Sequence, residues 1–500
     1  MGTENQFNLI DELWIPVTGA GRISLKQLFS KAEYRSLGGN PIQKIVLTKL
    51  LLAIAQSAST PESDDDWMNL GPHGVAKACL DYLEKWHERF FLYGERPFLQ
   101  IPEIKSASLQ SLGAPLPEIS TGNTTVLNQF QIKRNFSDAD KAMLIVQSMG
   151  FALGGKKTDN KITLSPGYQG KTNEQGKPKK TGKTGPFVGG SGYLHSFLQG
   201  QSLHETLWMN LFTRQQISGL CTYPGGLGVA PWEQMPEGED CPVARALKAS
   251  LMGRLVPISR FCLLEKDKIH YSEGIAYPGH KEGGRDPNVA VDSSGKEPKA
   301  LWTDPEKRPW RSLPALLDFA AQKNGKGFDC YQLRLNLDRS RSCVEFIGIW
   351  SGGLRVKSTS GEQYISLSGD FVESLITIES KIMGEDWFIH LNFEMEELVN
   401  LSKTLYGSVL NYFKNLRMKG DKHARRSSNL FWQLCERRSQ DLIRLCGDPE
   451  QTKKLRHEFA EFVCKAYDAS CPKETARQID SWARNRPKTH WYTDSEKEKS

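Results

Sequence analysis

Glycine and lysine dominate one stretch of this sequence, from Gly154 to Gly190. Between Lys156 and Lys183 there are eight lysines and two acidic residues, a local balance of +6. Glycine lets the backbone come close to a ligand, and lysine carries a positive charge on a long stem. Together these residues predict a loop that binds a polyanion, either a nucleotide phosphate or a nucleic-acid backbone.

A nucleotide-binding P-loop needs the pattern G-x-x-x-x-G-K-[ST], in which consecutive N–H groups wrap the phosphates. Gly182-Lys183-Thr184 supplies the end of this pattern, but position 177, where the first glycine is required, is a lysine. Gly170-Lys171-Thr172 would require a glycine at position 165, which is a serine. The stretch therefore favours a nucleic-acid backbone, and a solvated linker without a ligand is the alternative.

Residues that could perform catalysis or bind a metal do not converge in the sequence. The ten histidines are dispersed, and the common hydrolase, deaminase and metalloprotease motifs are missing. Ten cysteines without a CxxC pair argue against a zinc site and are typical of reduced thiols in a cytoplasmic protein. Asp64-Asp65-Asp66 is more typical of a helix cap than of a metal site, because Trp67 follows it. The sequence thus predicts no enzyme, no metal and no cofactor.

A second basic cluster lies near the C-terminus. Between residues 414 and 444 there are nine lysines and arginines against three acidic residues, with His423 in their midst. This cluster is either a solvated face or a set of phosphate contacts. Basic residues in two separate regions are what a DNA-binding groove between two domains would require.

Composition indicates a protein of more than one domain with ample core material. The chain has 500 residues, 38% of them hydrophobic, and a net charge of +7, which favours nucleic acid without requiring it. The N-terminus lacks the features of a signal peptide. The longest apolar run, Ile45 to Ala55, is too short to span a bilayer and predicts a buried helix that begins at Asn40 and Pro41. We therefore expect a cytoplasmic protein without a membrane partner.

The elements that must position these residues predict an α+β fold. We expect a large mixed α/β domain over residues 1–380, an antiparallel four-helix bundle over 385–490 and a disordered tail over 493–500. Apolar residues recur at helical spacing from Leu391 to Leu416, and further bundle helices are expected at roughly 424–446, 450–468 and 473–486. In the first domain we expect helices from about Ser24, at Trp67–Phe91 and at Leu203–Phe212, and strands at Phe7–Val17, Arg254–Leu264, Tyr331–Leu337 and Val344–Trp350.

The opening segment, Phe7-Asn8-Leu9-Ile10-Asp11-Glu12-Leu13-Trp14-Ile15-Pro16-Val17, resembles the opening signature of the CasA family. CasA is the large subunit of the type I-E CRISPR surveillance complex Cascade. The likeness continues in order through Arg96-Pro97-Phe98-Leu99-Gln100, Thr125-Val126-Leu127-Asn128-Gln129, the glycine- and lysine-rich stretch, Pro231-Trp232-Glu233 and the closing helical bundle. The resemblance therefore spans the whole chain.

The resemblance implies a non-catalytic subunit whose partners are double-stranded target DNA, guide RNA, the other Cascade subunits and a helicase–nuclease. Such a subunit recognises the protospacer-adjacent motif (PAM), a short sequence that flanks the target, mainly from the minor groove. A β-hairpin wedge opens the duplex so that the guide RNA can form an R-loop, and guide pairing carries the sequence information. The alternatives are a metal-dependent nuclease and a scaffold that contacts only proteins.

The resemblance also implies roles for particular residues. Val126-Leu127-Asn128 matches the loop that contacts the guide-RNA handle end of the complex. The PAM-reading glycine loop is expected within Ser165–Gly190, and its candidates are Gly167, Gly170, Lys171, Lys183, Gly189 and Gly190.

Two further sites are implied downstream. A lysine finger matches Lys266 or Lys268, ahead of a turn at Gly274. The wedge hairpin is expected after Gly352-Gly353-Leu354-Arg355, with Arg355, Lys357 and Ser358 as DNA contacts. The nearest glutamine to the wedge position is Gln363. The middle region has no cysteine cluster of the kind that binds zinc in some relatives, so no metal is expected.

Overall fold

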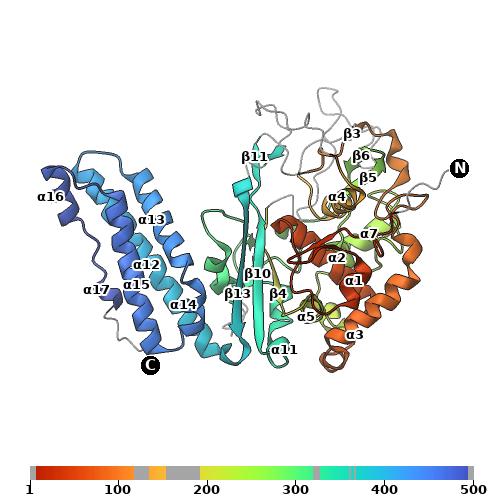
Figure 1. The fold of residues 1–500 in the computed structure, drawn as a ribbon, viewed down its shortest axis with the longest axis horizontal. Helices are drawn as coiled ribbons and strands as arrows, with labels where there is room; N and C mark the ends of the chain where they lie inside the picture. The colour runs from red at the N-terminus through yellow and green to blue at the C-terminus, as the bar shows by residue number, and fades with distance from the viewer. Residues whose placement is uncertain are drawn as a thin grey trace. The chain divides into compact units, whose positions relative to one another are not determined.

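The computed structural model describes residues 7–116, 135–153, 192–318, 327–359, 362–364 and 368–493. The chain divides into two compact units (Figure 1). The first unit contains residues 1–309 and 324–375, and the second contains residues 310–323 and 376–500. The second unit thus includes a segment that the sequence analysis placed in the first domain. This segment begins at Trp310, whose ring centroid lies 6.0 Å from that of Trp432 in the bundle.

The first unit mixes short strands with helices of varied length. Its helices are α1 (Leu25–Ser30), α2 (Pro41–Ser59), α3 (Asp64–Lys85), α4 (Asp138–Gly150), α5 (Leu203–Asn210), α6 (Arg214–Ser218), α7 (Pro242–Lys248), α8 (Met252–Leu255), α10 (Tyr331–Arg334) and α11 (Leu337–Arg341). Its strands are β1 (Ile15–Val17), β2 (Gly21–Ile23), β3 (Leu109–Ser111), β4 (His195–Gln199), β5 (Arg260–Glu265), β6 (Lys268–Glu273), β7 (Val291–Asp292), β8 (Lys299–Ala300), β9 (Phe328–Asp329), β10 (Phe346–Leu354), β11 (Lys357–Thr359) and β12 (Glu362–Tyr364).

Among the described residues, three small sheets carry most of the strands of this unit. Their strand orders are β13-β10-β4, β3-β6-β5 and β8-β7-β9, and β11 pairs only with β12. Strand β13 (Phe371–Glu379) begins in the first unit and ends in the second. Strand β10 is antiparallel to β4, with Gly352 opposite His195. The two partners are far apart in sequence, so this sheet could not be read from local patterns.

Helix α2 forms as the sequence predicts. Asn40 accepts a hydrogen bond from the Gln43 backbone N–H at 2.9 Å, Pro41 opens the first turn, and the apolar run is buried. Helix α3 begins with Asp64-Asp65-Asp66, where the Asp66 carboxylate accepts a hydrogen bond from Ser63, the N-cap. The three aspartates therefore form the first turn of the helix, and Asp66 completes the capping box with Ser63.

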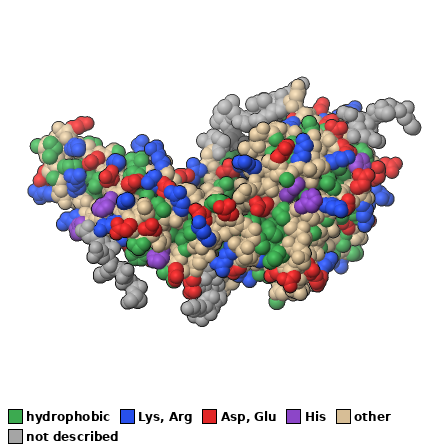
Figure 2. Space-filling model, turned by 60° about the horizontal axis from the view of Figure 1, so that its bottom comes forward, with side chains coloured by type: hydrophobic (Ala, Val, Ile, Leu, Met, Phe, Trp, Pro, Cys, Tyr) green, Lys and Arg blue, Asp and Glu red, His purple; other side chains and the backbone are tan. Residues whose placement is uncertain are grey.

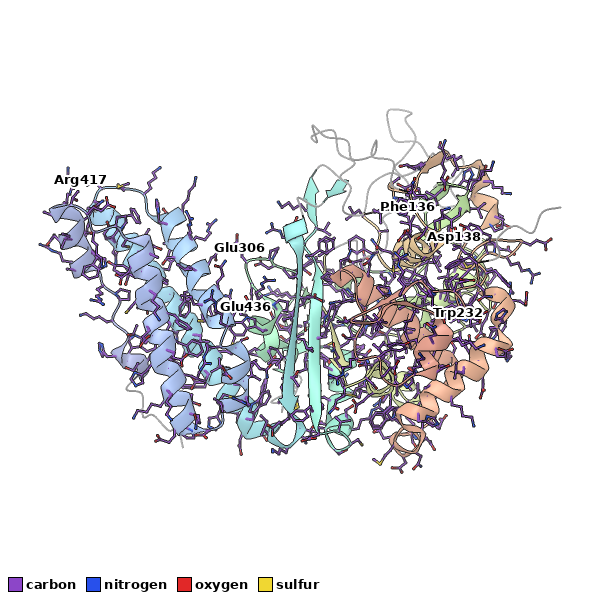
Figure 3. The ribbon with its side chains drawn as sticks, viewed as in Figure 1. Phe136, Asp138, Trp232, Glu306, Arg417 and Glu436 are labelled. Carbon is purple, nitrogen blue, oxygen red and sulfur yellow. The ribbon has the colours of Figure 1, made fainter. Side chains whose placement is uncertain are left out.

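Two of the family-like segments in the first unit are core residues. The ring of Trp232 lies 5.6 Å from Phe90 and 6.0 Å from Phe98 between centroids, and its indole N–H donates to the Tyr82 hydroxyl. Tyr82 in turn donates to Glu233. Trp232 lies within the first unit in Figure 3. Pro231-Trp232-Glu233 and the Phe98 segment thus hold one aromatic cluster together.

Three strand predictions were wrong in part or in whole. Residues Tyr331–Leu337 form helix α10 and the start of α11, because a short apolar run does not distinguish a strand from a buried helix. The segment Arg254–Leu264 begins with the last residues of helix α8, and only its later part is strand β5. Of Phe7–Val17, only Ile15–Val17 is a strand, since Asn8 forms just an isolated bridge with Phe91 and residues 9–11 form a turn.

The second unit contains the helical bundle. Its helices are α9 (Leu313–Leu316), α12 (Glu385–Asn415), α13 (Asp421–Glu436), α14 (Ser439–Leu445), α15 (Pro449–Ser470), α16 (Ala476–Arg484) and α17 (His490–Thr493). The predicted apolar stripe of α12 is buried from Leu391 to Tyr412. The predicted helix 424–446 is broken into α13 and α14, where the Ser439 hydroxyl donates to the Glu436 carbonyl. Helix α17 also reaches Thr493, the first residue of the predicted tail.

Two whole-chain features complete the fold. All ten cysteines are free thiols, and six of them are buried. Within the described part of the chain, no helix carries an apolar stretch long enough to cross a bilayer.

Candidate nucleic-acid interface

Two sets of predicted site residues lie outside the described part of the chain. One set is the handle-contacting loop, Val126, Leu127 and Asn128, and the other is the glycine loop with Gly167, Gly170, Lys171, Lys183, Gly189 and Gly190. The residues that flank both loops are described, so the structure shows where each loop leaves and re-enters the fold.

Lys266 and Lys268 lie at the tip of the β5–β6 hairpin. Glu265 pairs with Lys268, so Lys266 and Asp267 form a tight turn. Lys266 has φ of 52°, a left-handed conformation that costs a non-glycine residue about 1 kcal/mol. Both lysines are exposed, and neither forms an ion pair with another described residue. The hairpin thus presents two cations to solvent.

Acidic residues of the hairpin are bound by neighbouring groups. Asp267 lies 3.3 Å from the ammonium group of Lys141 on α4. Glu265 accepts a hydrogen bond from His270 at 2.9 Å, and this bond is the main cause of the lowered pKa of the Glu265 carboxyl. Both acids remain exposed, but each has a partner of its own, whereas Lys266 and Lys268 form no ion pair with another described residue.

The segment 100–111 supports the hairpin from one side. Strand β3 pairs with β6, and Ser111 lies opposite Lys268. The Gln100 side chain accepts a hydrogen bond from the Leu264 backbone N–H at 2.8 Å and donates to the Leu92 carbonyl. The family-like segment that ends at Gln100 therefore fixes the position of the lysine hairpin.

The turn expected at Gly274 lies elsewhere. The chain reverses at Lys266-Asp267, whereas Gly274 follows the end of β6. A Cβ atom on Gly274 would lie 2.5 Å from the Ser259 carbonyl carbon, so this glycine permits close approach of two backbone segments. The sequence alone could not show that the turn lies at Lys266-Asp267 and not at Gly274, because both places carry residues that occur in turns.

The segment Gly352-Gly353-Leu354-Arg355 ends strand β10. A Cβ atom on Gly353 would lie 2.6 Å from the Tyr193 carbonyl oxygen, so only glycine fits there. The Arg355 guanidinium binds the buried Asp370 carboxylate through an N–O distance of 3.0 Å, and its backbone N–H donates to the Asp370 carbonyl. The Arg355 side chain is thus held in an ion pair within the protein. The sequence offered no signal that Asp370 is its partner.

A β-hairpin does follow this segment. Lys357 pairs with Tyr364 and Ser358 pairs with Gln363 in the antiparallel β11–β12 pair. Strand β10 leads directly into this hairpin (Figure 1).

The end of the glycine loop meets the start of this hairpin. Gly192, the first described residue after the loop, has φ of 68° and packs against the backbone that leads into β11. A Cβ atom on Gly192 would lie 2.8 Å from the Leu354 carbonyl oxygen and 3.0 Å from the Val356 nitrogen. The end of the glycine loop and the start of the β11–β12 hairpin, far apart in sequence, therefore lie side by side.

Both flanks of the handle-contacting loop border one pocket of about 340 Å³. Leu116 precedes the loop, Asn135 follows it, and Trp14 of the opening motif lines the same pocket. Asp140 on α4 also lines it and binds Arg22. The opening motif and the two ends of this loop are thus neighbours in the first unit.

The second unit carries its own basic cluster, where α12 ends and α13 begins. Figure 3 shows Arg417 at this end of the bundle. The cluster is exposed, and no member forms an ion pair with another described residue; it consists of Lys414, Arg417, Lys419, Lys422, Arg425 and Arg426. The His423 ring stacks on Phe413 with centroids 4.2 Å apart, which fixes the turn. On the face that Figure 2 draws, lysines and arginines are interspersed with acids.

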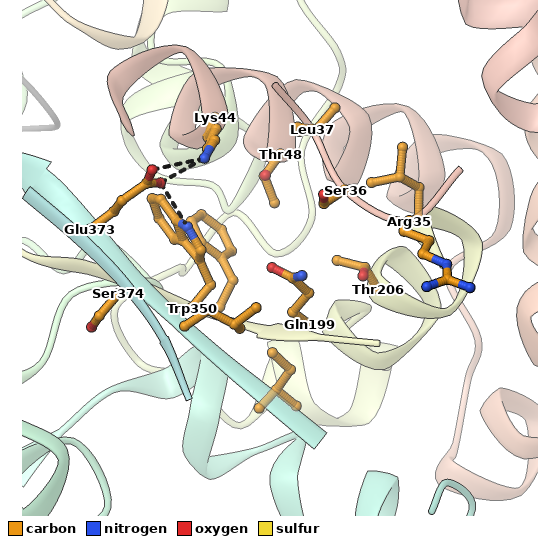
Figure 4. A pocket seen from close by; sticks show the side chains of 14 residues that line it. Arg35, Ser36, Leu37, Lys44, Thr48, Gln199, Thr206, Trp350, Glu373 and Ser374 are labelled. Atoms are coloured by element: carbon orange, nitrogen blue, oxygen red, sulfur yellow. Dashed lines mark hydrogen bonds and ion pairs between the residues drawn. The ribbon is translucent and has the colours of Figure 1, made fainter. Parts of the chain in front are cut away.

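A pocket of about 330 Å³ lies where α2 covers strands β10 and β13 (Figure 4). Glu373 accepts hydrogen bonds from Lys44 at 2.7 Å and from the Trp350 indole N–H at 3.2 Å. Its described lining holds no histidine, no cysteine and no carboxylate besides Glu373. No group of three His, Cys, Asp or Glu side chains that could hold a metal occurs among the described residues.

The sequence matches one protein family over most of its length. The family model described as CRISPR-associated protein Cse1 matches residues 8–468. A curated relative, CRISPR-associated protein CasA/Cse1 of Thermus thermophilus, is 33% identical over 171 residues. That match covers 31% of this chain and spans 33% of the relative's length.

Solved structures share the fold over nearly the whole chain. Thermobifida fusca Cse1 matches with a TM-score of 0.76 at 19% identity, over 98% of each chain. Thermus thermophilus CasA matches with a TM-score of 0.73 at 18% identity, over 98% of this chain and all of that one. A chain of a CRISPR RNA-guided surveillance complex matches with a TM-score of 0.67 at 15% identity, over 97% of this chain.

Proposed function

Because this chain belongs to the Cse1 family of CRISPR-associated proteins, we propose that it is a non-catalytic, DNA-recognising subunit of a Cascade surveillance complex. It contacts the PAM beside the target in duplex DNA and helps to open the duplex, so that guide RNA can pair with one strand. The other Cascade subunits and the guide RNA are its partners in this complex. The opened complex then recruits a helicase–nuclease.

One observation carries the proposal. The glycine- and lysine-rich segment re-enters the fold at Gly192, within contact distance of the backbone that leads into the β11–β12 hairpin. The first described residue after a segment with a local charge of +6 therefore lies beside the start of this hairpin. Charge that binds phosphates and a rigid element that can enter a base step are the two parts needed to grip and open DNA.

Lys266 and Lys268 contribute positive charge from a second hairpin of the same unit. Minor-groove edges carry a degenerate pattern, so a few donors read them permissively. Separation of a base step costs on the order of a few kcal/mol, which phosphate contacts and inserted side chains offset. The basic cluster of the bundle adds phosphate contacts from the second unit. The protein thus checks a short flank, and the guide reads the target.

The lysine hairpin gives a direct test. Replacement of both Lys266 and Lys268 by alanine should weaken binding of the assembled complex to target duplex. The slope of log K against log salt should become shallower by about one unit for each phosphate that the variant no longer neutralises, because fewer counterions are released on binding.

A matched control removes the same charge elsewhere in the unit. Lys77 on α3 and Lys296 are also exposed and without an ion pair to a described residue. The Lys77→Ala/Lys296→Ala variant should keep the wild-type salt slope. An unchanged slope in the hairpin variant, measured by filter binding over a salt series, would remove the hairpin from the DNA site.

A further inference from the structure

The first unit presents one exposed tryptophan where its DNA-contacting segments meet. Trp302 is 50% exposed, whereas the other tryptophans of the described chain are buried or half-buried. An indole ring in water leaves a large apolar surface unburied, and such residues are enriched at binding surfaces. We therefore expect a binding partner to cover the exposed indole ring of Trp302.

The ring of Trp302 is held by a rigid backing. Its centroid lies 5.0 Å from that of Tyr193 and 5.8 Å from that of His280. The Tyr193 hydroxyl and Nδ1 of His280 share a hydrogen bond of 2.7 Å, which ties the two backing rings together. Burial, together with the charges of Lys281 and Arg285, lowers the pKa of His280. The rings of Tyr193 and His280 pack against one side of the indole, and the rest of the indole is exposed to solvent.

The backbone of Trp302 is tied to both DNA-contacting segments. Tyr193 and Trp302 form an antiparallel bridge, and the Thr303 N–H donates to the Gly192 carbonyl at 2.9 Å. The Thr303 hydroxyl donates to the Tyr193 carbonyl, next to the point where Gly353 passes. The tryptophan thus stands at the junction of the glycine-loop end and the strand that leads to the β11–β12 hairpin.

Charge around the ring is mixed, with three basic and three acidic residues. Lys281 pairs with Glu297 at 2.7 Å, and Arg285 donates to the Val291 carbonyl and to the Ser293 hydroxyl. Lys299 is exposed nearby in sequence, and Asp304 and Glu306 follow the tryptophan. These side chains together give little affinity for phosphate. The part of a ligand that best fits the site is therefore a flat ring that carries little charge.

We propose that Trp302 is a stacking platform for one unpaired DNA base at the point where the duplex opens. This inference rests on the proposed function and adds to it a residue that holds the opened state. Stacking of a base on an aromatic side chain is tolerant of sequence and contributes substantially to binding of single strands. A base that leaves the duplex beside the hairpin loses its neighbours, and the indole replaces one of them. The platform thereby slows reclosure of the duplex.

The test uses the complete complex with guide RNA and target duplexes that carry 2-aminopurine at single positions beside the junction of flank and target, in either strand. In the wild-type complex, stacking on Trp302 should quench the fluorescence at one or two positions. Trp302→Ala should restore that fluorescence and weaken target binding roughly ten-fold. Trp302→Phe and Trp302→Tyr should recover most of the quenching, and Trp491→Ala, a half-buried tryptophan of the bundle unit, should change nothing.

The outcomes separate this inference from the proposed function. Equal fluorescence of wild type and Trp302→Ala at every position overturns the platform, while preference for flanked duplexes still supports the function. Failure of the Trp302→Ala chain to co-purify with the other subunits also overturns it, because the ring would then be a protein contact. If the wild-type complex shows no preference for any flank, the proposed function itself fails.

Discussion

Lys49 and Asp286 form an ion pair in the interior of the first unit, 2.6 Å apart and almost fully buried. Burial opposes ionisation of Asp286. The positive charge of Lys49 and the hydrogen bond donated by the Asn288 backbone N–H nevertheless hold the pKa of Asp286 below its ordinary value. Burial lowers the pKa of Lys49 despite this partner. The nearby His195 has both ring nitrogens without a hydrogen-bond partner in the described chain, and burial lowers its pKa to about 3, so it is neutral.

Removal of one member of this pair should be costly. Lys49→Met leaves the Asp286 charge buried without compensation, and we expect a decrease of about 3–5 kcal/mol in the free energy of unfolding. Lys49→Met/Asp286→Leu removes both charges and should recover part of that decrease. Lys44→Met, which breaks the more exposed pair with Glu373, should cost about 0–1 kcal/mol. Urea titrations followed by circular dichroism measure all three, and equal decreases for Lys49→Met and Lys44→Met would contradict this account.

His87 supports the opening motif through a pH-dependent bond. Its ring lies 2.7 Å from the Asp11 carboxylate, and this hydrogen bond is the main cause of the raised pKa of His87. The stabilisation is fully present below the ordinary pKa of 6.5 and is lost as the pH rises through the higher pKa of the folded state.

The wild-type protein should therefore lose its stability advantage over Asp11→Asn as the pH rises from below 6.5 to above the folded-state pKa. Thermal unfolding of both proteins across that range tests this. Parallel curves would show that the bond does not couple protonation to folding.

At the residue scale, the sequence revealed local caps but no long-range partners. Asn40 could be recognised as an N-cap because a cap is defined by residues within one turn, whereas Ser63, the N-cap of α3, was missed beside the three aspartates. Asp370 as the partner of Arg355, and Lys141 as the partner of Asp267, could not be recognised, since they depend on tertiary folding.

Elements with a strong period were predictable, and short elements were not. The stripe of α12 repeats over many turns, and its buried residues match the prediction. The run Tyr331–Leu337 is too short to distinguish a helix from a strand, and tertiary packing made it helical. The β11–β12 hairpin lies where the resemblance placed it, although its local sequence carries no strong turn signal beyond Ser360-Gly361.

Strand β10 passes the end of the glycine loop at Gly353, just before the β11–β12 hairpin. Gly353→Ala places a methyl group 2.6 Å from the Tyr193 carbonyl oxygen, so strand β10 must move away from the glycine-loop end. We expect a cost of about 1–3 kcal/mol in stability. Because the hairpin is displaced, we also expect weaker opening of target duplex at temperatures where the variant is folded.

Gly369→Ala is the matched control, since its Cβ atom would meet nothing within 4 Å. The two variants are compared by thermal unfolding and by permanganate reactivity of thymines in the bound target. Equal behaviour of both variants would mean that the junction does not position the hairpin.

At the scale of the whole molecule, each unit contributes a basic cluster on a stable framework. The first unit holds Lys266 and Lys268 on a braced hairpin, and the second holds the cluster around Arg417 on the bundle. Net charge of +7 over 500 residues predicted only a preference for polyanions. The sequence could not give the flanking sequence that our proposal has this chain recognise, because composition does not fix a loop conformation.

We propose that this chain supplies the flank preference of a guide-directed complex. The most direct measurement assembles the complex with the wild-type chain, with a chain that lacks Lys171–Lys183, or without the chain, and incubates each with duplexes that share one target and carry random flanks. Sequencing of the bound fraction should reveal a few enriched flanks with the wild-type chain and none in the other two cases. The same enriched flanks in the complex that lacks the chain would contradict the account.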